Sequence, residues 1–514
     1  MAPDARPCFL VLMVDQLAAA WLPFHGHRVV IAPHLSELAA GATVFDSAYT
    51  PFPLCAPARA AMLTGRFASR IGVFDNAAEM RTTTPTLAHA LRDAGYHTAV
   101  SGKMHFVGPD QLHGFEERLT TDIYPADVDW TPDWDRPLDR PLSWYHTMES
   151  VLEPGVCATS MQVDYDDEVC FRATRKLHDL ARHRPEQPFF LFVSFTSPHD
   201  PWELPARYWE RYRRDEIGDP TVPALPLDEL DPHSRRLRAM CQVDEAKLTP
   251  EQVRRARHGY YAAISYVDER IGEVLGALRD SGLEDRTTVV FCSDHGEMLG
   301  ERGLWYKMSF LEQSARVPLL VRRPGPNGDG VPARVATPVS LLDFAPTVLE
   351  LAGLRADAIA GPGDGVSLVP ALGGATSPSH PVFSEYEAEG VQAPAAMFRS
   401  GTHKLIVSLQ DPDLLYDLSV DPLELRNLAS SPEAEPAIER LRHEIETRLD
   451  LREIDGRVRE SQRERRLISQ ALHKGVAPSW DHEPRLDAAE QYIRNRDDMY
   501  ELQRRARLET RPVE

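Results

Sequence analysis

Residues 287–296 read Thr-Thr-Val-Val-Phe-Cys-Ser-Asp-His-Gly, an apolar run that ends in an acid and a histidine. The first apolar run of the chain, Cys8–Val14, is likewise followed at once by Asp15. Short apolar runs of this kind are typical of strands buried on both faces of a sheet. Three further runs have the same character: Thr98–Ser101, Pro188–Phe195 and Pro318–Val321.

Helical patterns lie between these runs, with apolar residues at helical spacing from Cys170 to Leu180 and from Tyr260 to Leu278. The alternation predicts an α/β fold, in which helices cover both faces of a mainly parallel sheet. Ligands of such sheets bind beyond the carboxyl ends of the strands. Four polar residues follow strand runs and should meet there: Asp15, Lys103, His199 and Asp294.

The chain is expected to divide into a catalytic domain (1–370), a smaller α+β subdomain (371–455) and a charged tail (456–514). A stretch rich in Gly, Pro, Ala and Ser, around Gly361–Ser379, is typical of a connection. Two strands, Ala396–Ser408 and Leu414–Leu418, and a helix, Pro436–Leu449, should form a small antiparallel sheet with a helix packed on it. The Arg-rich tail is expected to be helical.

Composition narrows the possible functions. The 514-residue chain has a formal net charge of -21, which disfavours nucleic acids and anionic membranes because both need a basic face. No apolar stretch is long enough to cross a bilayer, and Cys8–Val14 suits a buried strand better than a signal peptide. Six scattered cysteines without a Cys-x-x-Cys pair favour a reduced, cytoplasmic setting.

A metal site can be assembled from Asp15, Asp294 and His295, since all three follow strands. Carboxylate oxygens and an imidazole suit a divalent cation such as Ca²⁺, Mg²⁺ or Mn²⁺. An Asp-His-Gly sequence is otherwise typical of a turn or a helix cap. Its position directly after a Val-Val-Phe-Cys strand favours the metal site.

A family resemblance supports this interpretation. The stretch Cys55-Ala-Pro-Ala-Arg59, with Leu63-Thr64-Gly65-Arg66 after it, resembles the signature by which sulfatases have a cysteine oxidised to formylglycine. The other motifs occur in the order seen in sulfatases of the alkaline phosphatase superfamily: Asp15, Gly102-Lys103-Met104-His105, Ser197-Pro198-His199-Asp200 and Ser293-Asp294-His295-Gly296. The resemblance covers roughly residues 8–430.

This resemblance implies an alkaline-phosphatase-like core, a formylglycine made from Cys55 by a formylglycine-generating enzyme, and a covalent sulfo-enzyme intermediate. It also implies one bound divalent metal, for which we expect calcium, with magnesium or manganese as alternatives. The hydrated aldehyde offers two hydroxyl groups, one to attack sulfur and one to expel the product. In one respect the chain departs from the family: many sulfatases have two consecutive aspartates at the first metal position, whereas Gln16 follows Asp15 here.

The roles of the charged residues follow from the same resemblance. Arg59 and the metal would stabilise the alkoxide at residue 55, and Lys103 and Lys307 would hold the sulfate oxygens. His105 would act as base for the second hydroxyl. His199, with Lys307, would lie near the leaving oxygen. Taken alone, each histidine is more typical of a satisfied structural residue, and Lys307 of a surface lysine.

A narrower resemblance, to the choline sulfatases within this family, rests on longer runs. These are Phe74–Glu79, Lys103–Phe115, Thr121–Pro125, Glu385-Tyr386, Glu389-Gly390 and Tyr492–Asn495. They imply choline O-sulfate as the substrate, whose trimethylammonium group needs aromatic faces and carboxylates. The candidate contacts are Asn76, Trp130, His146, Glu385 and Asp498.

By this resemblance the tail reaches a neighbouring subunit and helps to complete its pocket, so a homo-oligomer, either dimer or tetramer, is expected. The alternative enzymes are a phosphonate monoester or phosphodiester hydrolase and an arylsulfatase, because the same nucleophile and metal serve phosphorus and other sulfate esters. The non-enzymatic alternative is a choline-type binding protein in which Cys55 is never oxidised.

Overall fold

The computed structural model describes residues 6–124, 127–136, 146–324, 333–359, 361, 363–373 and 381–474. Asp498, one of the predicted substrate contacts, lies outside the described residues. So do Tyr492–Asn495 of the predicted tail.

A mainly parallel sheet forms the centre of the described structure, with the strand order β10-β2-β9-β8-β1-β6-β3-β4 and β11 paired to β2. The central strand β1 (Cys8–Val14) pairs in parallel with β6 (Phe189–Ser194) and β8 (Thr287–Ser293), and all residues of the three are buried. Strand β9 (Arg316–Arg322) runs antiparallel to its neighbours. The remaining strands are β2 (Thr43–Tyr49), β3 (His97–Gly102), β4 (Glu117–Arg118), β10 (Ala333–Val335) and β11 (Val339–Ser340).

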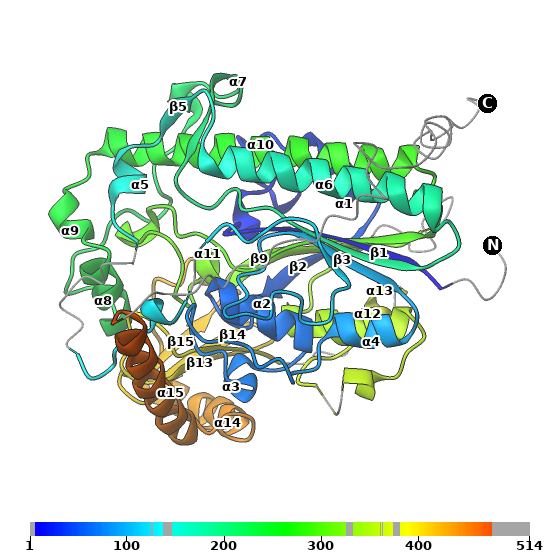
Figure 1. The fold of residues 1–514 in the computed structure, drawn as a ribbon. Coiled ribbons are helices and arrows are strands. Elements are labelled where there is room, and N and C mark those ends of the chain that lie inside the picture. The colour runs from blue at the N-terminus through cyan, green and yellow to red at the C-terminus, as the bar shows by residue number, and fades with distance from the viewer. Residues whose placement is uncertain are drawn as a thin grey trace.

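Helices cover both faces of this sheet (Figure 1). The long helices α6 (Met161–His183) and α10 (Pro250–Asp280) lie on one face, and α2 (Cys55–Thr64), α4 (Leu87–Asp93) and α12 (Phe344–Leu351) lie on the other. Helix α10 begins at a capping box, because Thr249 and Gln252 each accept a hydrogen bond from the other's backbone N–H. The predicted α/β fold class is confirmed.

Shorter helices complete the described part of the chain. They are α1 (Pro33–Ala40), α3 (Ala68–Ile71), α5 (Glu149–Leu152), α7 (Ala206–Trp209), α8 (Pro232–Met240), α9 (Val243–Ala246), α11 (Glu312–Ala315) and α13 (Val369–Leu372). Two short strands, β5 (Gly155–Cys157) and β7 (Glu203–Pro205), pair with each other beside α7.

The second sheet is antiparallel, as expected, with the order β12-β13-β14-β15. Its strands are β12 (Val382–Tyr386), β13 (Ala395–Ser400), β14 (His403–Ser408) and β15 (Leu414–Asp417). The single strand predicted over Ala396–Ser408 is wrong: the segment is a hairpin. Gly401 reverses the chain with a φ of 59°, a conformation that glycine adopts without steric cost.

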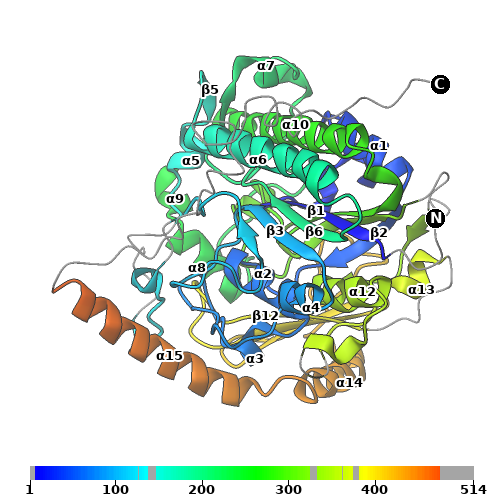
Figure 2. The same ribbon diagram turned by 45° about the vertical axis from the view of Figure 1, so that its right-hand side comes forward.

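Two helices follow the small sheet on the side of the main sheet opposite α6 and α10 (Figure 2). Helix α14 (Glu435–Glu446) packs on β13 and β14, and α15 (Leu451–Leu472) continues toward the end of the described chain. Helix α15 runs through residue 456, the predicted start of the tail. No helix in the described residues combines the length and apolarity that a bilayer crossing requires.

Candidate active site

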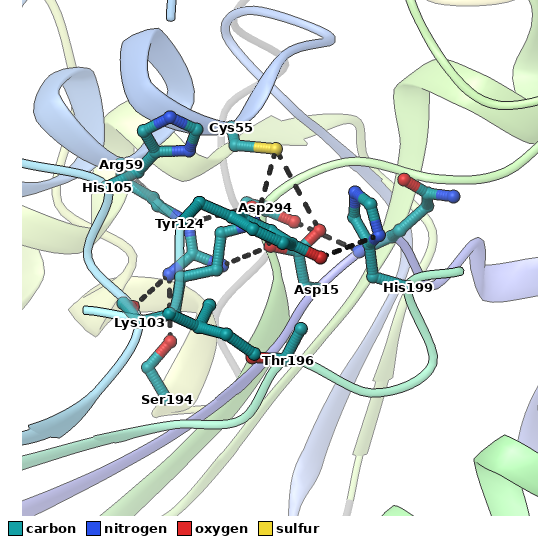
Figure 3. Close-up of polar contacts among 12 residues, drawn as sticks. Asp15, Cys55, Arg59, Lys103, His105, Tyr124, Ser194, Thr196, His199 and Asp294 are labelled. Atoms are coloured by element: carbon teal, nitrogen blue, oxygen red, sulfur yellow. Dashed lines mark hydrogen bonds and ion pairs between the residues drawn. The ribbon is translucent and has the colours of Figure 1, made fainter. Parts of the chain in front are cut away.

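The carboxyl ends of the central strands bring the predicted residues together (Figure 3). Asp15 follows β1, Lys103 follows β3, and Asp294 follows β8. The Lys103 Nζ atom lies 2.5 Å from Asp15 Oδ2, although the two residues are far apart in sequence. All three side chains are completely buried, so their charges interact in a medium of low polarity.

Cys55 is the first residue of α2 and is only 2% exposed. Its Sγ atom lies 3.1 Å from His295 Nε2, 3.7 Å from Lys103 Nζ and 3.9 Å from Asp15 Oδ1. Burial and the Asp15 charge would raise the pKa of the Cys55 thiol, but the surrounding cationic groups hold it well below its usual range. The position therefore favours a negatively charged atom, helped by the positive end of the helix.

The donor set around Cys55 fits a divalent metal. The ligand atoms of Asp15, Cys55, Asp294 and His295 lie within 4.8 Å of one another, and all four residues are buried. Oδ1 of each aspartate lies 3.7 Å from His295 Nε2. Two carboxylates and an imidazole are ligands that Ca²⁺, Mg²⁺ or Mn²⁺ accept.

Arg59 holds the far side of this cluster. One turn after Cys55 on α2, its Nη2 atom lies 3.0 Å from Asp15 Oδ2 and its Nε atom 2.8 Å from Asp294 Oδ2. A third bond, from Nη1 to Ser194 Oγ at 2.8 Å, reaches the end of β6. The guanidinium thus bonds to the Oδ2 atom of both aspartates. Their Oδ1 atoms are the ones that lie toward His295.

Gln16, which replaces the second aspartate of many sulfatases, makes a different set of contacts. Its amide oxygen accepts a hydrogen bond from Lys307 Nζ at 2.5 Å. Its amide nitrogen donates to Glu297 Oε2 at 2.6 Å and to Asp200 Oδ1 at 3.2 Å. The oxygen that could have served as a metal ligand is therefore directed at a lysine.

His199 and Lys307 form a pair beside this cluster, with Nε2 and Nζ 2.9 Å apart. Burial and the Lys307 charge lower the pKa of His199 to about 3, so its imidazole is neutral near pH 7. The His199 Nδ1 atom lies 2.7 Å from the Asp200 carbonyl oxygen and donates to it. The Nε2 atom is then an acceptor, and the proton between the two residues belongs to Lys307.

A cavity of about 340 Å³ opens above Cys55. Lys103 and Lys307 both line it. Trp130 lines it as well and meets His105 edge to face at 6.1 Å between ring centres. The remaining lining residues are Leu54, Asn76, Tyr124, His146, Thr147, Ser150, Met161, Gln162, His199, Asp200, Pro201 and Glu389.

The predicted substrate contacts are only partly brought together. Asn76, Trp130 and His146 line the cavity, whereas Glu385 does not. Glu385 is buried on β12, where its Oε1 atom accepts a hydrogen bond from the Ser69 backbone N–H at 2.8 Å.

Besides Asp200, the carboxylate that lines the cavity is that of Glu389, which is 2% exposed. Neither of its carboxylate oxygens has a hydrogen-bond partner in the described structure. Burial, reinforced by the nearby charge of Asp75, raises the pKa of Glu389 to about 8. A buried acid without a partner favours a cationic ligand, because a cation would stabilise its ionised form.

Comparison with known proteins decides the family. A family model described as "Sulfatase" matches residues 7–354. The chain belongs to the sulfatase family. Further models match the C-terminal part of this sulfatase: one described as "Choline sulfatase enzyme C terminal" over residues 456–508, and one as "N-sulphoglucosamine sulphohydrolase, C-terminal" over residues 300–450.

The resemblance to choline sulfatases is confirmed by a relative of that name. This sulfatase is 47% identical over 496 residues to the choline-sulfatase of Rhizobium meliloti (strain 1021), covering 95% of this chain and 96% of that protein. It is 30% identical to arylsulfatase K of Danio rerio, over 83% and 80% of the two chains. Among solved structures, the phosphonate monoester hydrolase of Agrobacterium radiobacter matches with a TM-score of 0.70 and 25% identity, covering 88% and 96%.

Sequence reasoning did not single out several residues of this sulfatase site. Tyr124 lies under Lys103, with Nζ 4.3 Å from the ring centre, and its hydroxyl group contacts His199 Nδ1 at 3.2 Å. Glu297 accepts a hydrogen bond from the Gln16 amide nitrogen at 2.6 Å. The runs Thr121–Pro125 and Glu389-Gly390 contained the signal for Tyr124 and Glu389, but Glu297 carried none.

Proposed function

We propose that this protein hydrolyses choline O-sulfate to choline and sulfate. One observation carries the proposal: a single cavity is lined by Cys55, by the two lysines Lys103 and Lys307, and by Trp130 and Glu389. Choline sulfate is a zwitterion with a sulfate at one end and a trimethylammonium group at the other, and the charges of the cavity complement it. The identity to a named choline-sulfatase supports the same conclusion.

The anionic end of the substrate would lie between Lys103 and Lys307. Both lysines are almost completely buried, so they are worth more to a bound anion than surface lysines would be. This local positive charge overcomes the chain's net charge of -21, which would otherwise repel a sulfate ester.

The trimethylammonium group of the substrate has no N–H to donate. Its partner must therefore attract it without a hydrogen bond of that kind. The face of Trp130 can supply about 0.5–2 kcal/mol by cation–π attraction. Glu389 adds a carboxylate, and the bound cation would favour its ionised form. A neutral aryl leaving group would gain nothing from Glu389, which favours choline sulfate over aryl sulfates.

Sulfatases use formylglycine, and Cys55 is the proposed precursor here. The hydrated aldehyde supplies one hydroxyl to attack sulfur and a second to release the product. Because Cys55 is 2% exposed in the folded chain, we expect a formylglycine-generating enzyme to act before folding is complete. The residues that hold the metal would be Asp15, Asp294 and His295 together with residue 55; a divalent metal there supplies positive charge that lowers the pKa of a bound hydroxyl.

The protein's own side chains would then manage the protons. His105 lies beside the cavity with both ring nitrogens free of hydrogen-bond partners in the described structure, so it can accept the proton of the second hydroxyl. Lys307 carries a proton that it can donate to the choline oxygen as that bond breaks. Neutral His199 orients Lys307 by accepting one of its hydrogen bonds.

Sulfate release from choline sulfate tests this function, with peptide mass analysis of residue 55. We expect turnover by the wild type, and a loss of more than about a thousandfold in Cys55→Ala, the scale seen when a nucleophile is removed. Unmodified wild-type protein that binds choline sulfate without turnover would instead support the binding-protein alternative. Turnover by Cys55→Ala at the wild-type rate would remove Cys55 from the mechanism.

Two further parts of the proposal concern the oligomeric state and the domain boundaries. We propose a homo-oligomer, supported by the match of residues 456–508 to a C-terminal model characteristic of choline sulfatase. We also propose that the boundaries 1–370, 371–455 and 456–514 separate the catalytic part, the small subdomain and the tail. The described part of α15 already contacts the turn that carries Trp130.

A further inference from the structure

Helix α15 packs beside the part of the cavity where the trimethylammonium group of the substrate would bind, near Trp130. The turn Val128–Trp130 packs on this helix, and the helix continues past the small sheet (Figure 2). Helix α15 also makes a buried ion pair outside this turn, between Arg465 and Asp75.

The Arg465–Asp75 pair is bidentate. Nη1 lies 2.6 Å from Asp75 Oδ1 and Nη2 lies 2.8 Å from Asp75 Oδ2. The side chains are 9% and 0% exposed. A third bond, from Arg465 Nη1 to Thr131 Oγ1 at 3.3 Å, ties the same guanidinium to the residue after Trp130. Two parallel bonds of this kind fix the orientation of both partners.

Asp75 stands directly before a residue of the cavity wall. Asn76 lines the cavity, and its Oδ1 atom accepts a hydrogen bond from the Ala56 backbone N–H at 3.0 Å, in the first turn of α2. Asp75 Oδ1 also accepts from the Ala77 backbone N–H at 2.9 Å. The turn that presents Asn76 is thus held from one side by Arg465.

A second route leads from α15 to Glu389. Gln462 Oε1 accepts a hydrogen bond from the Trp134 backbone N–H at 3.0 Å. The Trp134 indole N–H then donates to the Ala388 carbonyl at 3.1 Å, one residue before Glu389. Helix α15 therefore connects the segments that carry Asn76, Trp130 and Glu389.

We propose that Arg465 is a positioning residue that holds Asn76 and Trp130 in place for the trimethylammonium group and so sets the preference for choline sulfate. This inference rests on the proposed function and deepens it. Asp75 cannot be rehydrated where it lies, so loss of Arg465 leaves a buried charge without its partner. The turn must then shift, and the cationic end of the cavity shifts with it.

The loss should be greater for a cationic substrate than for an aryl sulfate, even though Asn76 also bonds to Ala56 beside Cys55. The hydrogen bonds of the Arg465 guanidinium go to Ser461, Asp75 and Thr131, none of which is among the residues that line the cavity. A residue needed only for general stability would instead weaken all substrates together.

The test compares Arg465→Ala with wild type on choline sulfate and on 4-nitrophenyl sulfate, which lacks a cationic group. We expect kcat/KM for choline sulfate to fall by at least about tenfold, mainly through a higher KM, and that for the aryl sulfate to change by less than about threefold. Arg465→Lys, which keeps the charge but loses the fork, should lie between. Arg463→Ala removes an exposed arginine from the same helix and should leave both substrates unchanged.

The double variant Asp75→Asn with Arg465→Gln guards against a folding defect, because it leaves no lone buried charge. Its KM for choline sulfate should also rise, since the bidentate bonds are gone. Equal losses on both substrates, or an unchanged KM for choline sulfate in folded variants, would overturn the positioning role while leaving the proposed function intact. Absence of choline sulfate turnover by fully converted wild type would overturn both.

Discussion

Gln16 and Lys307 are joined by a hydrogen bond of 2.5 Å between the amide oxygen and Nζ. This bond explains what the chain gains where many sulfatases have a second aspartate. A carboxylate at residue 16 would neutralise Lys307, whereas a neutral amide orients it and leaves its charge for the sulfate. A metal in this cluster would then have two carboxylates and one imidazole as protein ligands, besides residue 55.

Removal of the metal is the first prediction. Dialysis against a chelator should abolish sulfate release and lower Tm, because Asp15 and Asp294 would lose the positive charge that a metal would add to that of Arg59. At a ligand concentration one hundred times Kd, binding contributes about 2.7 kcal/mol to stability. Adding Ca²⁺, Mg²⁺ and Mn²⁺ back separately identifies the metal, and we expect calcium to restore most activity. Full activity after exhaustive chelation would contradict the site.

Trp130 is predicted to recognise the cation through the face of its ring. Trp130→Ala should lower kcat/KM for choline sulfate by about tenfold, the equivalent of about 1.4 kcal/mol of cation–π attraction. Trp130→Phe should retain much of the activity because an aromatic face remains. Both variants should hydrolyse an aryl sulfate nearly normally. Equal losses on the two substrates would remove Trp130 from the cationic end.

Glu389 predicts a pH dependence that is specific to the cationic substrate. Burial and Asp75 raise the pKa of Glu389 to about 8, so its carboxyl is neutral below that pH and charged above it. Affinity for choline sulfate, measured as 1/KM, should therefore rise as pH increases toward 8. The bound cation favours ionisation and moves the step to lower pH.

Glu389→Gln provides the matched control for this prediction. The glutamine has nearly the same shape but no titrating group, so the step in 1/KM should disappear while KM at high pH rises. An aryl sulfate should show no such step in either protein. A step that persists in Glu389→Gln would have to come from another group.

The C-terminal tail is predicted to support assembly and substrate use. Deleting residues 490–514 should weaken the oligomer, raise KM for choline sulfate, or both. Light scattering after size-exclusion chromatography reports the first effect and steady-state kinetics the second. An unchanged oligomer with normal kinetics would reduce these residues to a solvated appendage.

Strand ends were the most predictable feature of the site. An apolar run followed by Asp15 or Asp294 indicated both a buried strand and a functional position, because parallel strands present their carboxyl ends at one edge. The hairpin around Gly401 is harder to predict, since only Gly401 and Thr402 separate its two largely apolar strands. The prediction of one continuous strand over Ala396–Ser408 therefore omits the turn.

The sequence alone does not indicate which of Glu385 and Glu389 lines the cavity. Both acids occur in the runs that resemble choline sulfatases. Only their tertiary contacts distinguish Glu385, which lies within β12, from Glu389, which lies beyond the end of that strand. The rule that selected Asp15 does not find Glu389, because the residue directly after β12 is Glu387, which does not line the cavity. Arg465 carried no such signal, because an arginine in a charged helix is usually solvated; its pairing with Asp75 depends on tertiary packing.

The most direct measurement is kcat/KM for choline sulfate, an aryl sulfate and an aryl phosphonate, made on protein in which residue 55 is shown by peptide mass to be converted. If Trp130 and Glu389 bind the trimethylammonium group, choline sulfate should be preferred by at least about a hundredfold. This preference is the equivalent of about 2.8 kcal/mol, shared between the two residues. A preference for the phosphonate, the substrate class named for the structural relative with a TM-score of 0.70, would contradict the account. A preference for the aryl sulfate would show that the cationic end does not select the substrate.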